Sequence, residues 1–390
     1  MSNKKIGILI TILGLFTLAV YYLTSAGKTP YDYFTRLADS FLAGKYYLTE
    51  KPAWLTELIP SEGNKYFVVY PPMPAILSIP FRFFLKDVFQ QQYLAHILGA
   101  GIVALISLIS LKIKRDWKLM LWSALLAGIG NIIWYLSSSG SSWYLGQVSA
   151  AFFMSAAILE ALGKKRSFLM GIFIGVAFLS RLHTILCLPL IIYLIFDKKI
   201  WFKKLLYLGA GIAPFVLFNF YYNYVRFGTI IDQAYFILPK ILNETNSPWF
   251  IHGVLNISYI PNNLKTMFWS FPKLLNKIPF IQPSWNGLAI WITTPAFIYS
   301  LTSNIKEGLN KVSWLSIFLI LLVVVSHGGN GFSQFGYRFA VDFYPVLFLL
   351  TIKGVAKTGL KWHHWLLLVI SIIVNTWGVL WINKFGWVSF

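Results

Sequence analysis

The chain has 390 residues, of which 57% are hydrophobic and only 12% are charged. A soluble domain has roughly a quarter of its residues charged, so this composition excludes an ordinary soluble protein and predicts a membrane protein. The net charge of +20 does not predict a nucleic-acid partner, because the lysines fall in short clusters between apolar runs, where they would face anionic membrane lipids.

The apolar runs predict an all-α polytopic membrane protein that forms one membrane domain over residues 1–390. Each run is about long enough for a helix to cross the hydrocarbon core of a bilayer. We predict about eleven transmembrane helices, at 6–25, 92–112, 118–136, 147–163, 167–181, 183–197, 204–223, 285–303, 312–326, 341–355 and 364–381. Two large segments remain between them: a first outer loop with interfacial helices at 26–91, and a second outer loop at 224–284.

The positive charges predict the orientation of the chain. With the N-terminus in the cytoplasm and the C-terminus outside, every short inner loop is basic, whereas the outer loops 137–146 and 327–340 hold Arg338 as their single cation. The first span has no clear cleavage site behind it, so we expect an uncleaved anchor. Nine of the thirteen acidic residues then lie outside, and we expect the chemistry at the outer face.

The segment 71–86 is an exception to this pattern. It is short and contains four prolines, and counting it as a span would place the later basic loops outside. We therefore expect a broken, partly inserted helix at the outer interface.

The first outer loop contains the first two acidic residues of the chain, Asp32 and Asp39. Thr29 and Pro30 are typical of a helix start, and in such a helix Asp32, Arg36 and Asp39 share one face. The functional interpretation is a general base, a carboxylate that takes the proton from an attacking hydroxyl. The structural interpretation is that Asp32 stabilises the helix dipole and Asp39 pairs with Arg36.

A series of aromatic-rich motifs follows in order along most of the chain. They are Tyr31-Asp32-Tyr33-Phe34, Leu37-Ala38-Asp39, Trp54-Leu55-x-Glu57, Tyr66 to Ala75, Trp143-Tyr144-x-Gly146-Gln147, Tyr222 to Gly228, and Gln334 to Phe343. This order resembles bacterial membrane glycosyltransferases of the GT-C superfamily, the group of protein O-mannosyltransferases and aminoarabinose transferase.

The resemblance implies a GT-C-like fold in the inner cell membrane and an enzyme of the hexosyltransferase type. Such enzymes move a sugar from a polyprenyl-phosphate donor to an extracytoplasmic acceptor, which is a glycan, a lipid or a protein. Their catalytic acid lies just after the first span, so the resemblance implies a catalytic role for Asp32, with Asp39 as the second candidate. Relatives often carry two adjacent acids where this chain has Tyr31-Asp32-Tyr33, so the choice between the two aspartates stays open.

Two outer arginines are candidates for binding the donor phosphate. Arg181 and Arg338 lie at the outer ends of predicted spans, and a guanidinium can bind phosphate in bidentate fashion. The alternatives are that Arg181 snorkels to the interface, and that Arg338 pairs with Asp342, four residues further on.

We expect further residues to line the substrate site: Arg36, Glu57, Tyr70, Trp143, Gln147, His183, Tyr337 and Asp342. The aromatic rings among them suit either stacking on a sugar or an interfacial belt. No spacing of histidine and acidic residues indicates a dedicated metal site, so we name no certain cofactor. A divalent metal ion shared by Asp32 and the donor phosphate is compatible with the sequence but is not indicated by it.

Two other functions stay open at this point. A transporter or flippase of lipid-linked sugars usually carries charges at mid-span, whereas the charges here gather at outer ends and in outer loops. A glycan polymerase or ligase that uses diphosphate-linked lipids would share the outer arginines, and the sequence separates it poorly from a transferase.

Overall fold

The computed structural model describes residues 1–388, which are mainly helical. The α-helices are α1 (Asn3–Leu23), α2 (Tyr33–Leu42), α3 (Met73–Leu85), α4 (Gln91–Ile113), α5 (Trp117–Gly128), α6 (Ile133–Ser139), α7 (Ser142–Leu162), α8 (Ser167–Ser180), α9 (Leu188–Ile195), α10 (Trp201–Phe227), α11 (Ala234–Ile241), α12 (Ile260–Trp269), α13 (Ile290–Thr293), α14 (Gly308–Ser326), α15 (Tyr344–Thr358) and α16 (Trp362–Val379). Short 3-10 helices are η1 (Lys86–Val88), η2 (Leu182–Cys187), η3 (Ile257–Tyr259), η4 (Pro295–Thr302) and η5 (Arg338–Phe343), and a π-helical turn, η6 (Leu380–Lys384), follows α16.

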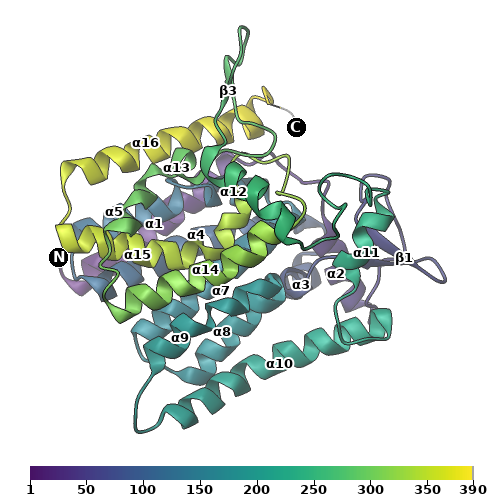
Figure 1. Ribbon diagram of the computed structural model, residues 1–390, viewed down its shortest axis with the longest axis horizontal. Helices are drawn as coiled ribbons and strands as arrows, with labels where there is room; N and C mark the ends of the chain where they lie inside the picture. The colour runs from purple at the N-terminus through teal and green to yellow at the C-terminus, as the bar shows by residue number, and fades with distance from the viewer. Residues whose placement is uncertain (389–390) are drawn as a thin grey trace.

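Within these residues there are also two small antiparallel hairpins. Strand β1 (Leu58–Ser61) pairs with β2 (Lys65–Val68), with Leu58 opposite Val68, and β3 (Lys273–Leu274) pairs with β4 (Ile281–Gln282). Figure 1 shows the long helices side by side, with α16 along one edge of the array and α10 along the opposite edge. Helices α2, α3 and α11 and the first hairpin gather beyond one end of the array.

Within residues 1–388, seven helices are long and apolar enough to cross a membrane, and the pair α5 and α6, bent by 48°, is an eighth candidate. The chain is therefore a multi-pass membrane protein, although the predicted number of eleven spans is not confirmed. Helix α8 and the stretch Leu182–Ile195 are apolar but shorter. The predicted span 285–303 is wrong as a continuous helix, because it contains only α13 and η4. Pro295 disfavours helical geometry at the residue before it, and Thr294 is indeed non-helical.

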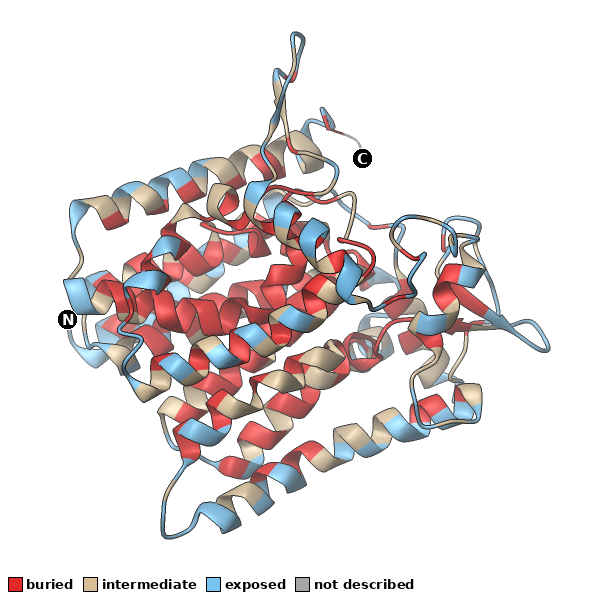
Figure 2. Ribbon diagram, in the orientation of Figure 1, coloured by how far each residue is buried: buried red, intermediate tan, exposed pale blue. Residues whose placement is uncertain are grey.

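Buried residues concentrate in the centre of the array, where α15 is almost wholly buried, whereas α10 exposes most of its length (Figure 2). Helix α10 packs closely on α8 through two glycines. A Cβ atom on Gly171 would lie 2.3 Å from the carbonyl oxygen of Leu208, and one on Gly211 would lie 2.2 Å from that of Phe168. Glycine at both positions therefore lets the two backbones touch, as small residues do between membrane helices.

The segment 71–86 forms one continuous helix, α3, so the predicted break is wrong. Pro71 and Pro72 precede the helix and Pro74 lies in its first turn, where no intrahelical N–H bond is needed. Pro80 alone lies in the interior. The number of prolines was therefore a poor guide to a break in this segment, because most of them lie before the helix or in its first turn.

The two large outer segments meet and form a cover over the end of the helix array. Ile59 and Phe67 of the first hairpin pack against Leu238 of α11. Arg226, near the end of α10, donates to the carbonyl oxygen of Val68 at 2.9 Å. We call this assembly, made of residues 26–91 and 224–284, the outer cover, after the orientation that the sequence predicts.

Candidate functional site

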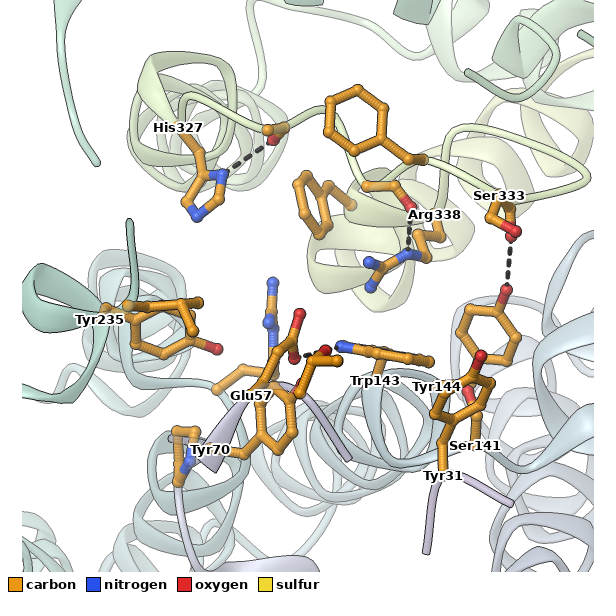
Figure 3. Close-up of a pocket in the computed structure, with 18 of the residues that line it drawn as sticks. Tyr31, Glu57, Tyr70, Ser141, Trp143, Tyr144, Tyr235, His327, Ser333 and Arg338 are labelled. Carbon is orange, nitrogen blue, oxygen red and sulfur yellow. Dashed lines mark hydrogen bonds between the residues drawn. The ribbon is translucent and has the colours of Figure 1, made fainter. Parts of the chain in front are cut away.

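A cavity of about 870 Å³ lies between the outer cover and the ends of the core helices. Its walls come from the first outer loop, the start of α7, the junction of α8 and η2, the second outer loop and the loop before η5. Figure 3 shows side chains from these segments converging on a common space. Because its walls come from segments far apart in the sequence, this site depends on the tertiary fold.

Arg338 faces this cavity without an ion-pair partner in the described part of the chain. Its Nε donates to the carbonyl oxygen of Gly331 at 3.1 Å, and its Nη1 donates to Oε1 of Gln147 at 3.4 Å. The residue is only 8% exposed. A buried cation is costly unless a counter-charge meets it, so this part of the cavity is suited to an anionic group.

The backbone around Arg338 is shaped to hold it. Gly331 has a φ of +93°, and a Cβ atom there would lie 3.0 Å from Nε of Arg338. Glycine is therefore required both by the backbone conformation and by the close approach of the guanidinium. The guanidinium also lies over the rings of Phe339, at 4.7 Å, and Tyr144, at 5.6 Å, where cation–π attraction stabilises it.

Arg181 also lines the cavity, but its charge is balanced by Asp342. Its Nη2 lies 2.9 Å from Oδ2 of Asp342, and Nε2 of His183 lies 2.8 Å from the same oxygen. The expected alternative of an Arg338–Asp342 pair is wrong. Both residues lie in η5, a 3-10 helix, in which residues four apart do not share a face as they do in an α-helix.

Glu57 immediately precedes strand β1, and its side chain points into the cavity (Figure 3). Its Oε2 accepts a hydrogen bond from Nε1 of Trp143 at 2.9 Å. Burial raises the pKa of Glu57 from 4.5 to about 7, while the Trp143 hydrogen bond and the charge of Arg338 act in the opposite direction. Glu57 thus combines a perturbed pKa with a position in a cleft, a combination that is frequent at functional sites.

The two aspartates of the first outer loop are held in ion pairs, and neither is among the residues that line the cavity. Asp32 pairs with Arg36 at 2.8 Å, and Asp39 pairs with Arg82 of α3 at 2.6 Å. The expected pairing of Asp39 with Arg36 is therefore wrong. Helix α2 begins at Tyr33, so Asp32 is its N-cap residue rather than part of its first turn. The catalytic role predicted for either aspartate stays a prediction.

The other predicted lining residues fall into two groups. Tyr70, Trp143 and His183 line the cavity, as do Glu57 and the two predicted phosphate-binding arginines. Arg36, Gln147, Tyr337 and Asp342 are not among the lining residues. Gln147 and Asp342 instead contact Arg338 and Arg181, which do line it.

Several lining residues were not predicted as site residues, notably Asp232, Tyr235, Glu244, Trp249 and His327. Four of them belong to the second outer loop, which carries acidic and aromatic residues but no motif that singles them out. Glu244 accepts a hydrogen bond from Nε1 of Trp249 at 2.8 Å. Burial lowers the pKa of His327 to about 4, so its imidazole is neutral near pH 7.

Among the described residues, no group of three or more His, Cys, Asp or Glu side chains is arranged to hold a metal ion. His327 binds the carbonyl oxygen of Gly329 through Nδ1 at 2.8 Å, and His183 binds Asp342. Both cavity histidines therefore have partners within the protein.

No protein-family model and no curated protein matches this sequence. Among solved structures, the fold is similar to that of ArnT from Cupriavidus metallidurans, whose crystal structure was determined bound to undecaprenyl phosphate. The match has a TM-score of 0.55 and 12% sequence identity, and it covers 96% of this chain. The chain spans only 64% of the length of that protein. At this level of identity the likeness shows that the two chains have a similar fold.

Proposed function

We propose that this protein is a membrane glycosyltransferase that moves a sugar from a polyprenyl-phosphate donor to a hydroxyl of an extracytoplasmic acceptor. The observation that carries the proposal is the buried guanidinium of Arg338, which faces a cavity of about 870 Å³ without an acidic partner in the described chain. The similar fold of ArnT, a protein crystallised with undecaprenyl phosphate, adds support for a lipid phosphate as the anion.

The arginines and the aromatic rings have complementary roles in this proposal. Arg338 and Arg181 bind the phosphate of the donor, and they stabilise the charge that develops on it as the bond to the sugar breaks. The sugar lies against the aromatic wall, where the ring centroids of Tyr31 and Trp143 are 4.7 Å apart. A hexose remains our prediction for the sugar.

The direct test is to incubate purified protein with candidate polyprenyl-phosphate sugars and to measure free polyprenyl phosphate. We expect the parent protein to release free polyprenyl phosphate, and the Arg338→Ala variant to release little. A flippase would move the intact donor across a vesicle membrane and release no polyprenyl phosphate. A polymerase or ligase would release product only from diphosphate-linked donors, and either result would contradict the proposal.

A further inference from the structure

We infer that Glu57, rather than Asp32 or Asp39, is the general base that accepts the proton of the acceptor hydroxyl. This inference rests on the proposed glycosyl transfer. It assigns the catalytic role to the glutamate that lines the cavity, in place of the two aspartates, which form ion pairs and are not among the lining residues.

Helix α7 places Glu57 in a defined relation to the phosphate-binding arginine. Trp143 and Gln147 are spaced i, i+4 on this helix, so they lie on one face about one turn apart. Trp143 donates to Oε2 of Glu57 at 2.9 Å. Gln147 contacts Arg338 twice: its Nε2 donates to the carbonyl oxygen at 2.8 Å, and its Oε1 accepts from the guanidinium at 3.4 Å. A single helical turn therefore positions both the base and the anion site.

The backbone of Glu57 is fixed as well. Its N–H donates to the hydroxyl oxygen of Tyr33 at 3.1 Å, and the following residue begins strand β1. The second carboxylate oxygen, Oε1, accepts no hydrogen bond from the described residues, so it is available to an acceptor hydroxyl in the cavity. A held carboxylate with one free oxygen is the geometry that proton abstraction requires.

The other carboxylates of the cavity wall are engaged differently. Asp232 accepts from the backbone N–H of Ala234 at 3.0 Å and so stabilises the start of α11. Glu244 accepts a hydrogen bond from Trp249, five residues away in the same loop. Among the described residues it has no hydrogen bond to α7, the helix whose Gln147 contacts Arg338. Glu57 is thus the wall carboxylate that is coupled through α7 to the anion site.

The acceptor oxygen forms a bond to the anomeric carbon of the sugar while the bond between that carbon and the donor phosphate oxygen breaks. The electron pair of the breaking bond stays on the phosphate, which leaves as polyprenyl phosphate beside Arg338 and Arg181. The proton of the acceptor hydroxyl moves to Oε1 of Glu57.

The surroundings of Glu57 suit a base that works near neutral pH. Burial raises its pKa to about 7, Trp143 and Arg338 lower it, and Glu244 raises it. Tyr33 and Tyr235 also interact with its charge. A base whose pKa lies near the working pH combines the correct protonation state with a useful driving force for proton transfer.

The test compares Glu57→Gln with Asp32→Asn and Asp39→Asn by release of polyprenyl phosphate. Glu57→Gln should lose about 10²- to 10⁴-fold in turnover, the usual contribution of a general base, while binding of the polyprenyl-phosphate sugar donor stays unchanged. The acid side of the pH–rate profile, with a midpoint near pH 7 in the parent protein, should disappear in this variant. Asp32→Asn and Asp39→Asn should keep both the profile and most of the turnover.

A second variant tests the positioning role of Trp143. Trp143→Phe keeps the ring but removes the N–H donor, so it should raise the pKa of Glu57 and move the acid limb of the profile to higher pH. Trp249→Phe is the matched control, because it removes the equivalent donor to Glu244 and should leave the midpoint in place.

The outcomes separate this inference from the proposed function. If the parent protein releases no polyprenyl phosphate from any donor, the proposed function fails, and the role of Glu57 fails with it. An active parent protein together with a fully active Glu57→Gln overturns the role of Glu57 alone. The role is also overturned if Glu57→Gln loses donor binding along with turnover, or if Asp32→Asn abolishes the acid limb.

Discussion

The two arginines of the cavity differ in how their charges are balanced. Arg181 shares the carboxylate of Asp342 with His183, whereas Arg338 is held by a backbone carbonyl, a glutamine side chain and aromatic rings. Both line the cavity, but only Arg181 also neutralises a buried acid. Substitution should therefore affect the two positions differently.

We predict that Arg338→Ala raises the KM for the donor with little loss of stability, and that Arg338→Lys restores only part of the affinity because the bidentate geometry is lost. Arg181→Ala should weaken donor use and also lower the free energy of unfolding by about 3 kcal/mol, since it leaves Asp342 buried without its cation. Donor kinetics and thermal unfolding in detergent measure both effects. Arg166→Ala, at an exposed ion pair, is the control. Unchanged donor affinity in both alanine variants would move the phosphate site elsewhere.

The raised pKa of Glu57 predicts that the stability of the protein depends on pH. This effect is separate from the role of Glu57 in turnover. Its pKa is raised from 4.5 to about 7 in the folded state. Between these values the native state binds more protons than the unfolded state, so the free energy of unfolding falls as the pH rises.

We predict that Glu57→Gln removes this fall in the free energy of unfolding with rising pH. Relative to the parent protein, the variant should gain about 3 kcal/mol at most between pH 4 and pH 8, because each pH unit of a pKa difference corresponds to about 1.4 kcal/mol. Thermal unfolding at the two pH values measures this difference. Identical pH dependence in the two proteins would show that Glu57 is solvated like an ordinary surface acid.

At the level of secondary-structure elements, the contact between α2 and α3 includes one bidentate ion pair. Nε and Nη2 of Arg82 donate to the two carboxylate oxygens of Asp39, and the guanidinium also contacts Asp87 and backbone carbonyl oxygens after α3. The Arg82 side chain is only 11% exposed. Asp39 thus forms an ion pair, as in the structural interpretation of the sequence, but its partner is Arg82 and not Arg36.

We predict that Asp39→Asn and Arg82→Ala each lower the free energy of unfolding by about 1–3 kcal/mol, and that the double variant loses less than the sum, because both changes break the same pair. Denaturation in detergent provides the measurement. If Asp39 has a catalytic role, Asp39→Asn should lose turnover far beyond Arg82→Ala, and equal turnover in both would leave Asp39 as a structural residue.

At the scale of the whole molecule, the start of α1 and the end of α16 lie at opposite ends of the helix array (Figure 1). The orientation itself, with the N-terminus in the cytoplasm and the outer cover outside, stays the prediction that the lysine distribution gives. Mapping accessible cysteines on both sides of the membrane tests this orientation.

We predict that a cysteine at Lys240, an exposed position of the outer cover, reacts with a membrane-impermeant reagent from outside. Lys199→Cys, in the loop before α10, should react only from the cytoplasmic side. Cys187 is buried and can be replaced by alanine to remove background. Labelling of Lys240→Cys from the cytoplasmic side alone would reverse the topology.

Properties that depend on local composition and spacing could be predicted from the amino-acid sequence alone. Apolar runs predicted the helices α1, α4, α7 and α14, because length and hydropathy are sufficient to indicate a membrane span. The polar, aromatic segments between them marked the outer cover. Four residues predicted for the site, Arg181, Arg338, Glu57 and Trp143, line one cavity, and their functional roles stay predictions.

Which of these residues contact one another could be seen only in the folded chain. Asp342 and Arg181 are 161 positions apart, and Trp143 and Glu57 are 86 apart. No local period relates such pairs. The tertiary structure likewise placed Glu57 in the cavity wall, whereas Asp32 and Asp39 form ion pairs and are not among the lining residues. The physical reason is that burial and charge balance depend on the packing of distant segments, whereas hydropathy and helical spacing are properties of a single segment.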